Sequence, residues 1–344
     1  MDRAYLLYLG LPTVTTTFAS LQEQNSGGAP ARSSEPGVGS FTVAPRAEAA
    51  ITQAVDSAWH VAAALRTVSP PHAAKVETLA SASMTAGSGP SAADEFFRIG
   101  KALAVLAVQL KCSAKARSRF GEISSAASSM EIAAETLLPR ILCVHGSYQS
   151  ASIFRTKLKM LEKRLKQCAV LRFIDAPHTP EDAVASQGIG ASRCWWQKGA
   201  QRGQPHPQWA EQWAASRNIL WRALWDALGK GEPFHGVLGF SNGAAATAML
   251  LASLTEPDAP PSPKFAILCA GYLPNSLAGA PAIDLPSLHV VGIADDMIPV
   301  PQARELQNIF VEPCEYLHDQ GHVVPQRAAD CEMLSGWIKA RSQA

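Results

Sequence analysis

The chain has 344 residues, of which 47% are hydrophobic, 17% are charged and 7% are aromatic. This length accommodates one large domain or one domain with an extension, and the apolar fraction excludes a wholly disordered chain. Thirty Lys and Arg residues against 29 Asp and Glu residues give a net charge of +1, so nothing indicates nucleic-acid binding.

The sequence gives little support for a membrane span or for secretion. No stretch approaches the ~18 uninterrupted apolar residues of a transmembrane helix. The short apolar run Ala4–Leu11 ends at Pro12, and Asp2 offsets Arg3, which disfavours a secretory signal. Seven cysteines without a Cys-x-x-Cys pair predict neither a zinc site nor a disulfide framework. We therefore expect a cytoplasmic protein with reduced thiols, and the nucleus is the alternative compartment.

Residues 1–138 differ in composition from the rest of the chain. They are rich in Ala, Ser, Thr and Gly, and Asn25–Gly39 has almost nothing to bury, which predicts a flexible linker. Apolar residues recur at three- and four-residue steps in Ala47–Val68 and Ala92–Leu110, which predicts two helices. We expect an N-terminal extension that is partly helical or disordered. Its apolar stripes would suit docking on a protein partner or on the rest of the chain.

From Pro139 onward, short apolar runs alternate with amphipathic stretches. The runs predict strands at Arg140–Val144, Ala169–Ile174, Gly236–Phe240, Phe265–Ala270, Leu288–Ile293 and Cys314–Leu317. The stretches between them predict helices at Ser152–Gln167, Trp209–Leu228, Gly243–Leu254, Pro301–Phe310 and Gln326–Lys339. This alternation predicts an α/β domain at residues 139–344, with a mostly parallel, doubly wound sheet covered by helices on both faces.

The most informative motif is Gly239-Phe240-Ser241-Asn242-Gly243, a G-x-S-x-G sequence between a predicted strand and an alanine-rich predicted helix. In a nucleophile elbow the serine occupies a cramped strand-to-helix turn, and side chains two residues to either side would collide with it. The pentapeptide alone is a weak signal, but its position between strand and helix strengthens it. We expect Ser241 to be a nucleophile. The alternative is an ordinary turn with a surface serine.

A serine hydroxyl needs a base that takes its proton and an acid that orients the base. In enzymes with such an elbow, the acid and then the histidine follow the serine along the chain. Asp295 follows one predicted strand, and His322 lies in the loop after the next strand. Both are expected at the carboxyl edge of the sheet, where ligands bind in open α/β folds. We therefore expect Asp295 to be the acid and His322 to be the base.

Other residues are weaker candidates for these two roles. Asp296 adjoins Asp295, and strand twist decides which of the two carboxylates faces the histidine. His289 lies inside an apolar strand, where a hydrogen-bonded core histidine is expected. His318 still belongs to the end of a strand, and His145 is expected to shape a loop rather than to transfer protons.

Acyl transfer also needs two backbone N–H donors for the developing oxyanion. One is expected at Asn242, directly after the nucleophile. The other is expected in the loop after the first strand of the domain, with Ser147 as the first choice and Tyr148 as the second. Only the backbone of Asn242 is required, so its side-chain substitution should be milder than substitution of Ser241.

A long irregular segment, Thr179–Pro207, suits a loop or lid over the site. It carries Trp195 and Trp196, which together with Tyr148 are expected to line the substrate pocket. An equal alternative is that the two tryptophans pack this segment on the domain. No cluster of Arg or Lys accompanies the loop that carries Ser241, so an acidic substrate is not indicated.

Several motifs in the second part of the chain together resemble the FSH-type serine hydrolase family. In chain order they are Ile141–Ser150, Phe173–Pro177, Arg193–Trp196, Gly239–Gly243, Gly292–Pro299 and Gly321–Pro325. The resemblance implies an α/β-hydrolase fold and the hydrolysis of carboxylic esters or thioesters, without a metal or cofactor. It also implies that Ser241, Asp295 and His322 are nucleophile, acid and base.

The chain departs from the family pattern at two positions. The family commonly has Gln in place of Asn242 and Gly in place of Gln320. Neither departure removes a catalytic atom, so the rate is more in question than the reaction type. The alternative function is an inactive α/β-hydrolase relative that binds a ligand or partner, although an apparently complete triad weighs against it. We expect a small-molecule acyl ester as substrate.

Overall fold

The computed structural model describes residues 45–66, 69–86, 90–111, 120–181, 192–198 and 207–343. The predicted linker Asn25–Gly39 and most of the predicted lid Thr179–Pro207 lie outside these residues. Within the described ranges, no helix is both long enough and apolar enough to cross a membrane.

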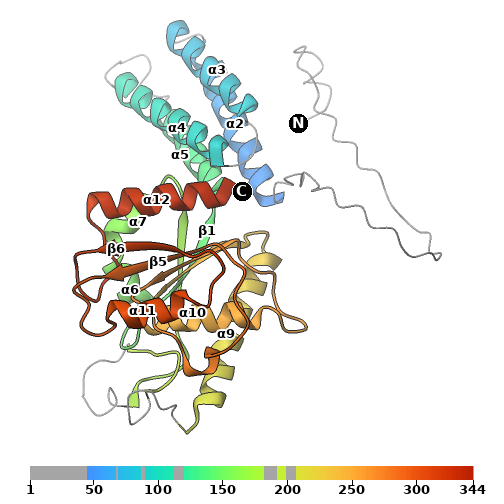
Figure 1. The fold of residues 1–344 in the computed structure, drawn as a ribbon. Helices are drawn as coiled ribbons and strands as arrows, with labels where there is room; N and C mark the ends of the chain where they lie inside the picture. The colour runs from blue at the N-terminus through green and yellow to red at the C-terminus, as the bar shows by residue number, and fades with distance from the viewer. Residues whose placement is uncertain are drawn as a thin grey trace, which may run out of the picture. The chain divides into compact units, whose positions relative to one another are not determined.

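The first described part of the chain is helical (Figure 1). Its helices are α2 (Pro45–Leu65), α3 (Pro70–Thr85), α4 (Pro90–Lys111) and α5 (Phe120–Leu137). Their apolar side chains share one core, which includes the fully buried Phe96, Leu103 and Met130. The two predicted helices are confirmed as α2 and α4. The sequence analysis missed α3 and α5, because many of their buried residues are alanines, which give a weak periodic signal.

The remaining part contains a six-stranded sheet in the order β2-β1-β3-β4-β5-β6, in which every neighbouring pair is parallel. The strands are β1 (Arg140–Val144), β2 (Val170–Ile174), β3 (Phe234–Phe240), β4 (Phe265–Cys269), β5 (Ser287–Gly292) and β6 (Cys314–His318). The inner strands β1, β4 and β5 are buried along their whole length, as expected for a parallel sheet covered on both faces. The predicted α/β class is confirmed.

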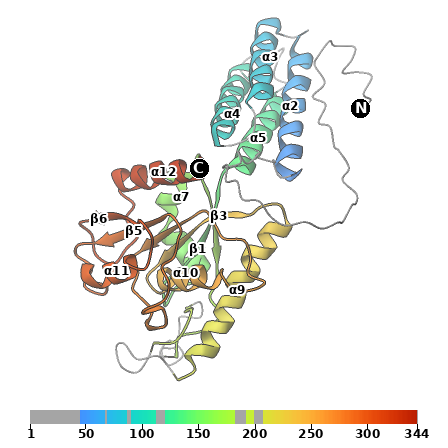
Figure 2. The same cartoon turned by 45° about the vertical axis from the view of Figure 1, so that its right-hand side comes forward.

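Two sets of helices cover the two faces of this sheet (Figures 1 and 2). The first set is α9 (Trp209–Gly229), α10 (Asn242–Ser253) and α11 (Val300–Gln307), and the second is α6 (Ala151–Lys157), α7 (Lys159–Leu165) and α12 (Ala328–Gln343). Alternate residues of β1 divide between them, since Leu142 packs with the first set and Ile141 with the second. The prediction of a single helix at Ser152–Gln167 is wrong, because the structure has two helices there. Backbone angles of φ −93° and ψ 12° at Leu158 divide it into α6 and α7.

Candidate active site

The winding of the chain reverses between β1 and β3. From β1 the chain moves to β2 on one side, and from β3 it proceeds through β4, β5 and β6 on the other. Loops diverge at such a switch point, which opens a crevice at the carboxyl edge of the sheet. The loop after β1 begins at His145, and Ser241 directly follows β3. The loop expected to supply an oxyanion donor and the turn that carries Ser241 therefore meet where open α/β sheets bind ligands.

Ser241 occupies a strained turn between β3 and α10. Its φ of 54° and ψ of −119° lie in a region that non-glycine residues rarely adopt, at a cost of roughly 1–3 kcal/mol. The turn is held by the Ser241 N–H, which donates to the Cys269 carbonyl oxygen at 2.9 Å. A β-carbon at Gly243 would lie 2.1 Å from the Val144 carbonyl oxygen, so only glycine lets α10 approach β1 this closely. This is the cramped geometry that the pentapeptide predicts.

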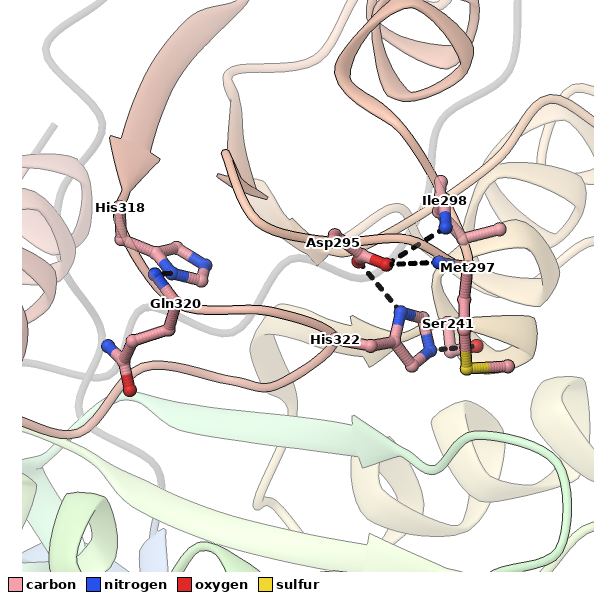
Figure 3. A network of polar contacts seen from close by, with 7 residues as sticks. All are labelled: Ser241, Asp295, Met297, Ile298, His318, Gln320 and His322. Atoms are coloured by element: carbon pink, nitrogen blue, oxygen red, sulfur yellow. Dashed lines mark hydrogen bonds and ion pairs between the residues drawn. The ribbon is translucent and has the colours of Figure 1, made fainter.

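The His322 imidazole lies between Ser241 and Asp295 (Figure 3). Its Nε2 is 3.0 Å from Ser241 Oγ, and its Nδ1 is 2.8 Å from Asp295 Oδ2. The other oxygen of Asp295, Oδ1, accepts the backbone N–H groups of Met297 at 3.0 Å and Ile298 at 2.9 Å. The ionised carboxylate only accepts hydrogen bonds, so the proton of a neutral imidazole is assigned to Nδ1. Nε2 is then free to take a proton from the serine.

The loop after β6 reaches the loop after β5 because Gly292 has no side chain. A β-carbon at Gly292 would lie 2.5 Å from the Gln320 carbonyl oxygen and 2.6 Å from that of Gly321. Gln320, where the family commonly has glycine, also donates from Nε2 to Asp330 Oδ2 at 3.3 Å. This departure from the family pattern therefore adds an anchor between the loop that carries His322 and helix α12.

Among the described residues, Ser241 makes no hydrogen bond to the weaker candidates for acid and base. Asp296 is exposed, and it is Asp295 whose carboxylate meets His322. His289 is buried within β5, where its Nε2 lies 3.2 Å from Ser287 Oγ and burial lowers its pKa to about 4. His318 is buried at the end of β6 and accepts the Gln320 N–H at Nδ1.

His145 holds the loop after β1 in place. It is fully buried, its Nδ1 donates to the Gly146 carbonyl oxygen at 2.8 Å, and its Nε2 accepts the Ala176 N–H at 3.1 Å. A ring that donates at one nitrogen and accepts at the other must be neutral. Burial lowers the His145 pKa, which also favours the neutral form. The expectation that His145 shapes the loop therefore agrees with the contacts of its ring.

The three backbone N–H groups proposed as oxyanion donors differ in their hydrogen bonding. The N–H groups of Ser147 and Asn242 donate no hydrogen bond to any other residue that the structure describes. The Tyr148 N–H instead donates to the Arg193 carbonyl oxygen at 2.9 Å. The second choice, Tyr148, is therefore wrong as a donor, because its N–H is already engaged. Ser147 stays the prediction together with Asn242.

A cavity of about 240 Å³ lies beside the loop that carries Ser147. Tyr148, Trp196, Cys194 and Lys198 are among its lining residues, and Lys198 Nζ lies 5.2 Å from the centre of the Tyr148 ring. The sequence analysis missed Lys198, because one isolated lysine in an irregular segment gives no pattern.

Trp195 does not line this cavity, and its burial argues against the expectation that it walls a substrate pocket. Its side chain is 0% exposed, and its indole N–H donates to the His145 carbonyl oxygen at 2.8 Å. The alternative interpretation, that a tryptophan packs the segment on the domain, is the one that its burial supports.

The Asn242 side chain makes contacts that the sequence did not indicate. Its Oδ1 accepts the Trp195 N–H at 3.0 Å, and its Nδ2 donates to the Tyr272 hydroxyl at 3.2 Å. Burial raises the Tyr272 pKa, and the hydrogen bond from Asn242 opposes this shift. In the sequence, the only sign of a special role for this side chain was that Asn242 replaces the Gln common in the family. That replacement did not indicate Trp195 or Tyr272 as its partners.

Comparison with known proteins extends these observations. Residues 136–334 match the family described as Serine hydrolase (FSH1). Esterase OVCA2 of Danio rerio is 34% identical over 220 residues, which cover 58% of this chain and 96% of the relative. An esterase of Caenorhabditis elegans is 30% identical over 207 residues, which cover 58% of this chain and 92% of the relative. Among solved structures, Arabidopsis thaliana SOBER1 has a TM-score of 0.46 at 17% identity, covering 59% of this chain and 98% of that one.

Proposed function

Since this chain belongs to the FSH1 serine hydrolase family, we propose that it cleaves carboxylic esters or thioesters through a covalent acyl-enzyme. The parallel sheet with helices on both faces is an α/β-hydrolase fold. Relatives named as esterases support an ester bond as the target. The observation that carries the proposal is the His322 ring, which reaches Ser241 with one nitrogen and Asp295 with the other.

In the first half-reaction, Ser241 Oγ attacks the substrate carbonyl carbon while its proton moves to His322 Nε2. Asp295 stabilises the imidazolium that forms, and the N–H groups of Ser147 and Asn242 stabilise the oxyanion. The tetrahedral intermediate then collapses. The bond to the leaving alcohol or thiol breaks, the leaving group takes the proton from His322, and Ser241 remains acylated.

In the second half-reaction, water replaces the leaving group. His322 Nε2 takes a proton from the water as its oxygen attacks the acyl carbon. Collapse of this second intermediate returns the proton to Ser241 Oγ and releases the carboxylic acid. Neither half-reaction uses a metal or a redox cofactor.

The cavity beside Ser147 is the proposed site for one part of a small-molecule substrate. Its volume of about 240 Å³ is below the roughly 300–1,000 Å³ typical of sites for whole drug-sized ligands, so we assign it either the acyl group or the leaving group. Tyr148 and Trp196 supply aromatic walls. We further propose that residues 139–344 are the hydrolase domain, that residues 1–138 are an extension with a protein partner, and that the protein is cytoplasmic.

Labelling with a fluorophosphonate probe tests the proposed function on the purified full chain. The probe should phosphonylate the wild-type protein and should not label Ser241→Ala. A Ser262→Ala variant is the matched control, because it removes an exposed serine outside the site. A panel of nitrophenyl esters then measures hydrolysis.

Hydrolysis by Ser241→Ala at the wild-type rate would contradict the assignment of the nucleophile. A folded wild-type protein that neither takes the label nor hydrolyses any ester would instead support the inactive, ligand-binding alternative.

A further inference from the structure

Trp195 hydrogen-bonds to both loops that supply the proposed oxyanion donors. Its indole N–H donates to the His145 carbonyl oxygen at 2.8 Å, two residues before Ser147. Its backbone N–H donates to Asn242 Oδ1 at 3.0 Å. These partners are 50 and 47 residues away in the chain, on opposite sides of Trp195 in sequence. One buried residue therefore links the loop after β1 to the start of α10.

The segment around Trp195 is itself firmly held. The Trp195 carbonyl oxygen accepts a hydrogen bond from Ser216 Oγ on α9. Two residues before it, the Arg193 N–H donates to the Gln149 carbonyl oxygen at 2.7 Å, and the Arg193 carbonyl oxygen accepts the Tyr148 N–H at 2.9 Å. Hydrogen bonds on both sides of Ser147 thus tie its loop to this segment.

The distance between the Ser147 and Asn242 donors matters because both must point at one oxygen atom. The two N–H groups follow different strands, so no single turn of the backbone sets their separation. Hydrogen bonds weaken steeply with distance and angle, and a misplacement of about 1 Å can cost roughly a hundredfold in rate. A rigid connection between the two loops would keep both donors aimed at the site before the substrate arrives.

We propose that Trp195 is a positioning residue that fixes the separation of the Ser147 and Asn242 N–H groups, the two oxyanion donors. This inference rests on the proposed function. Trp195 is 0% exposed, so its side chain offers no surface to a substrate. It acts through the backbone of His145 and the side chain of Asn242. This gives the Asn242 side chain a second role beside its backbone N–H.

Trp195→Phe tests the proposal, because it keeps an aromatic ring and removes the indole N–H. Trp221→Phe is the matched control, since the Trp221 indole N–H donates at 3.0 Å to Ser253 Oγ, outside the site. For the full-length variants we would measure kcat and KM with a nitrophenyl ester, and the affinity for a trifluoromethyl ketone, whose serine adduct carries an oxyanion.

We expect Trp195→Phe to lower kcat about tenfold and to change KM less than about twofold. The affinity for the trifluoromethyl ketone should fall by the same factor as kcat, because both depend on the oxyanion. Trp221→Phe should keep the wild-type values. A role in packing alone would not produce parallel losses in these two quantities.

Ser216→Ala is the second variant if Trp195→Phe does not fold. It removes only the anchor of the Trp195 carbonyl oxygen, so we expect a smaller loss in the same direction. The proposal is overturned if the folded variants keep the wild-type kcat, if Trp221→Phe loses as much, or if only KM changes. Failure of the proposed function gives a different result, namely wild-type protein that takes no fluorophosphonate label.

Discussion

The helices α2–α5 and the sheet β1–β6 each bury an extensive apolar core, but they use their polar side chains differently. In the helical region, ion pairs lie on the surface, such as Arg98 with Glu95 and Arg66 with Glu77. In the sheet region, His322 joins partners 27 and 81 residues away within one contact network. The parallel sheet brings distant loops to one edge, and the helices have no equivalent edge.

This difference suggests how mutations in the two regions should act. Exposed ion pairs on helices contribute about 0–1 kcal/mol each, so the helical region depends on its core for stability. In the sheet region, a few buried polar atoms set the proposed chemistry. A substitution in the helical core should therefore change stability alone, whereas one at the sheet edge should change activity.

The largest expected effect is at the acid. Asp295→Asn should lower kcat by about four orders of magnitude, because an amide in place of the carboxylate favours the wrong imidazole tautomer. Asp296→Asn, one residue away and exposed, should keep the wild-type kcat. Steady-state hydrolysis of a nitrophenyl ester measures both. Equal losses of kcat in the two variants would contradict the assignment of Asp295, rather than Asp296, as the acid.

The next effect should separate stability from activity in the helical region. Phe96→Ala removes a fully buried ring and should cost about 3–5 kcal/mol of unfolding free energy. At a temperature where the variant remains folded, its kcat should equal that of the wild type. Val105→Ala, exposed on the same helix, is the control for stability. A large fall in kcat for folded Phe96→Ala would show that the two regions are coupled.

A third effect concerns acid pH and the sheet region. Burial lowers the pKa of His289 to about 4, while the nearby Glu315 opposes this shift. The folded chain therefore keeps His289 neutral where the unfolded chain takes up a proton, below about pH 6.5. Stability should fall as the pH drops from about 6.5 towards 4, and this histidine should contribute up to about 3 kcal/mol.

Urea unfolding of His289→Leu at pH 7.5 and pH 5 would measure that contribution. The variant should show a smaller loss between the two pH values than the wild type does. Val291→Ala, also buried in β5, should lower stability by a similar amount at both pH values. An unchanged pH dependence in His289→Leu would contradict the assignment.

The smallest effect tests the close packing of the elbow. Gly243→Ala places a methyl carbon against the Val144 carbonyl oxygen, which should cost about 1–3 kcal/mol of stability and also lower kcat. Gly336→Ala in α12 meets no atom within 4 Å and should stabilise the chain by roughly 0.5–1 kcal/mol. Thermal unfolding with parallel ester assays distinguishes them. A Gly243→Ala protein as stable and active as the wild type would contradict the cramped turn.

Much of the fold could be predicted because its elements leave local signals. The strand predicted at Arg140–Val144 matches β1, and the helix predicted at Trp209–Leu228 differs from α9 by one residue. Helices α3 and α5 were missed because many of their buried residues are alanines, which occur both inside and outside helical cores. The bend at Leu158 was missed because no proline or glycine marks it.

The sequence by itself determined the chain order of Ser241, Asp295 and His322 and their place at strand ends, because motif spacing and strand alternation are properties of the local chain. Only the tertiary structure decided that Asp295 rather than Asp296 meets the histidine, and that the Tyr148 N–H is already engaged. It also decided that Trp195 is buried while its neighbour Trp196 lines a cavity. These outcomes depend on which way a side chain or N–H points in an irregular loop. That direction is set by hydrogen bonds to distant segments, and no local period in the sequence encodes them.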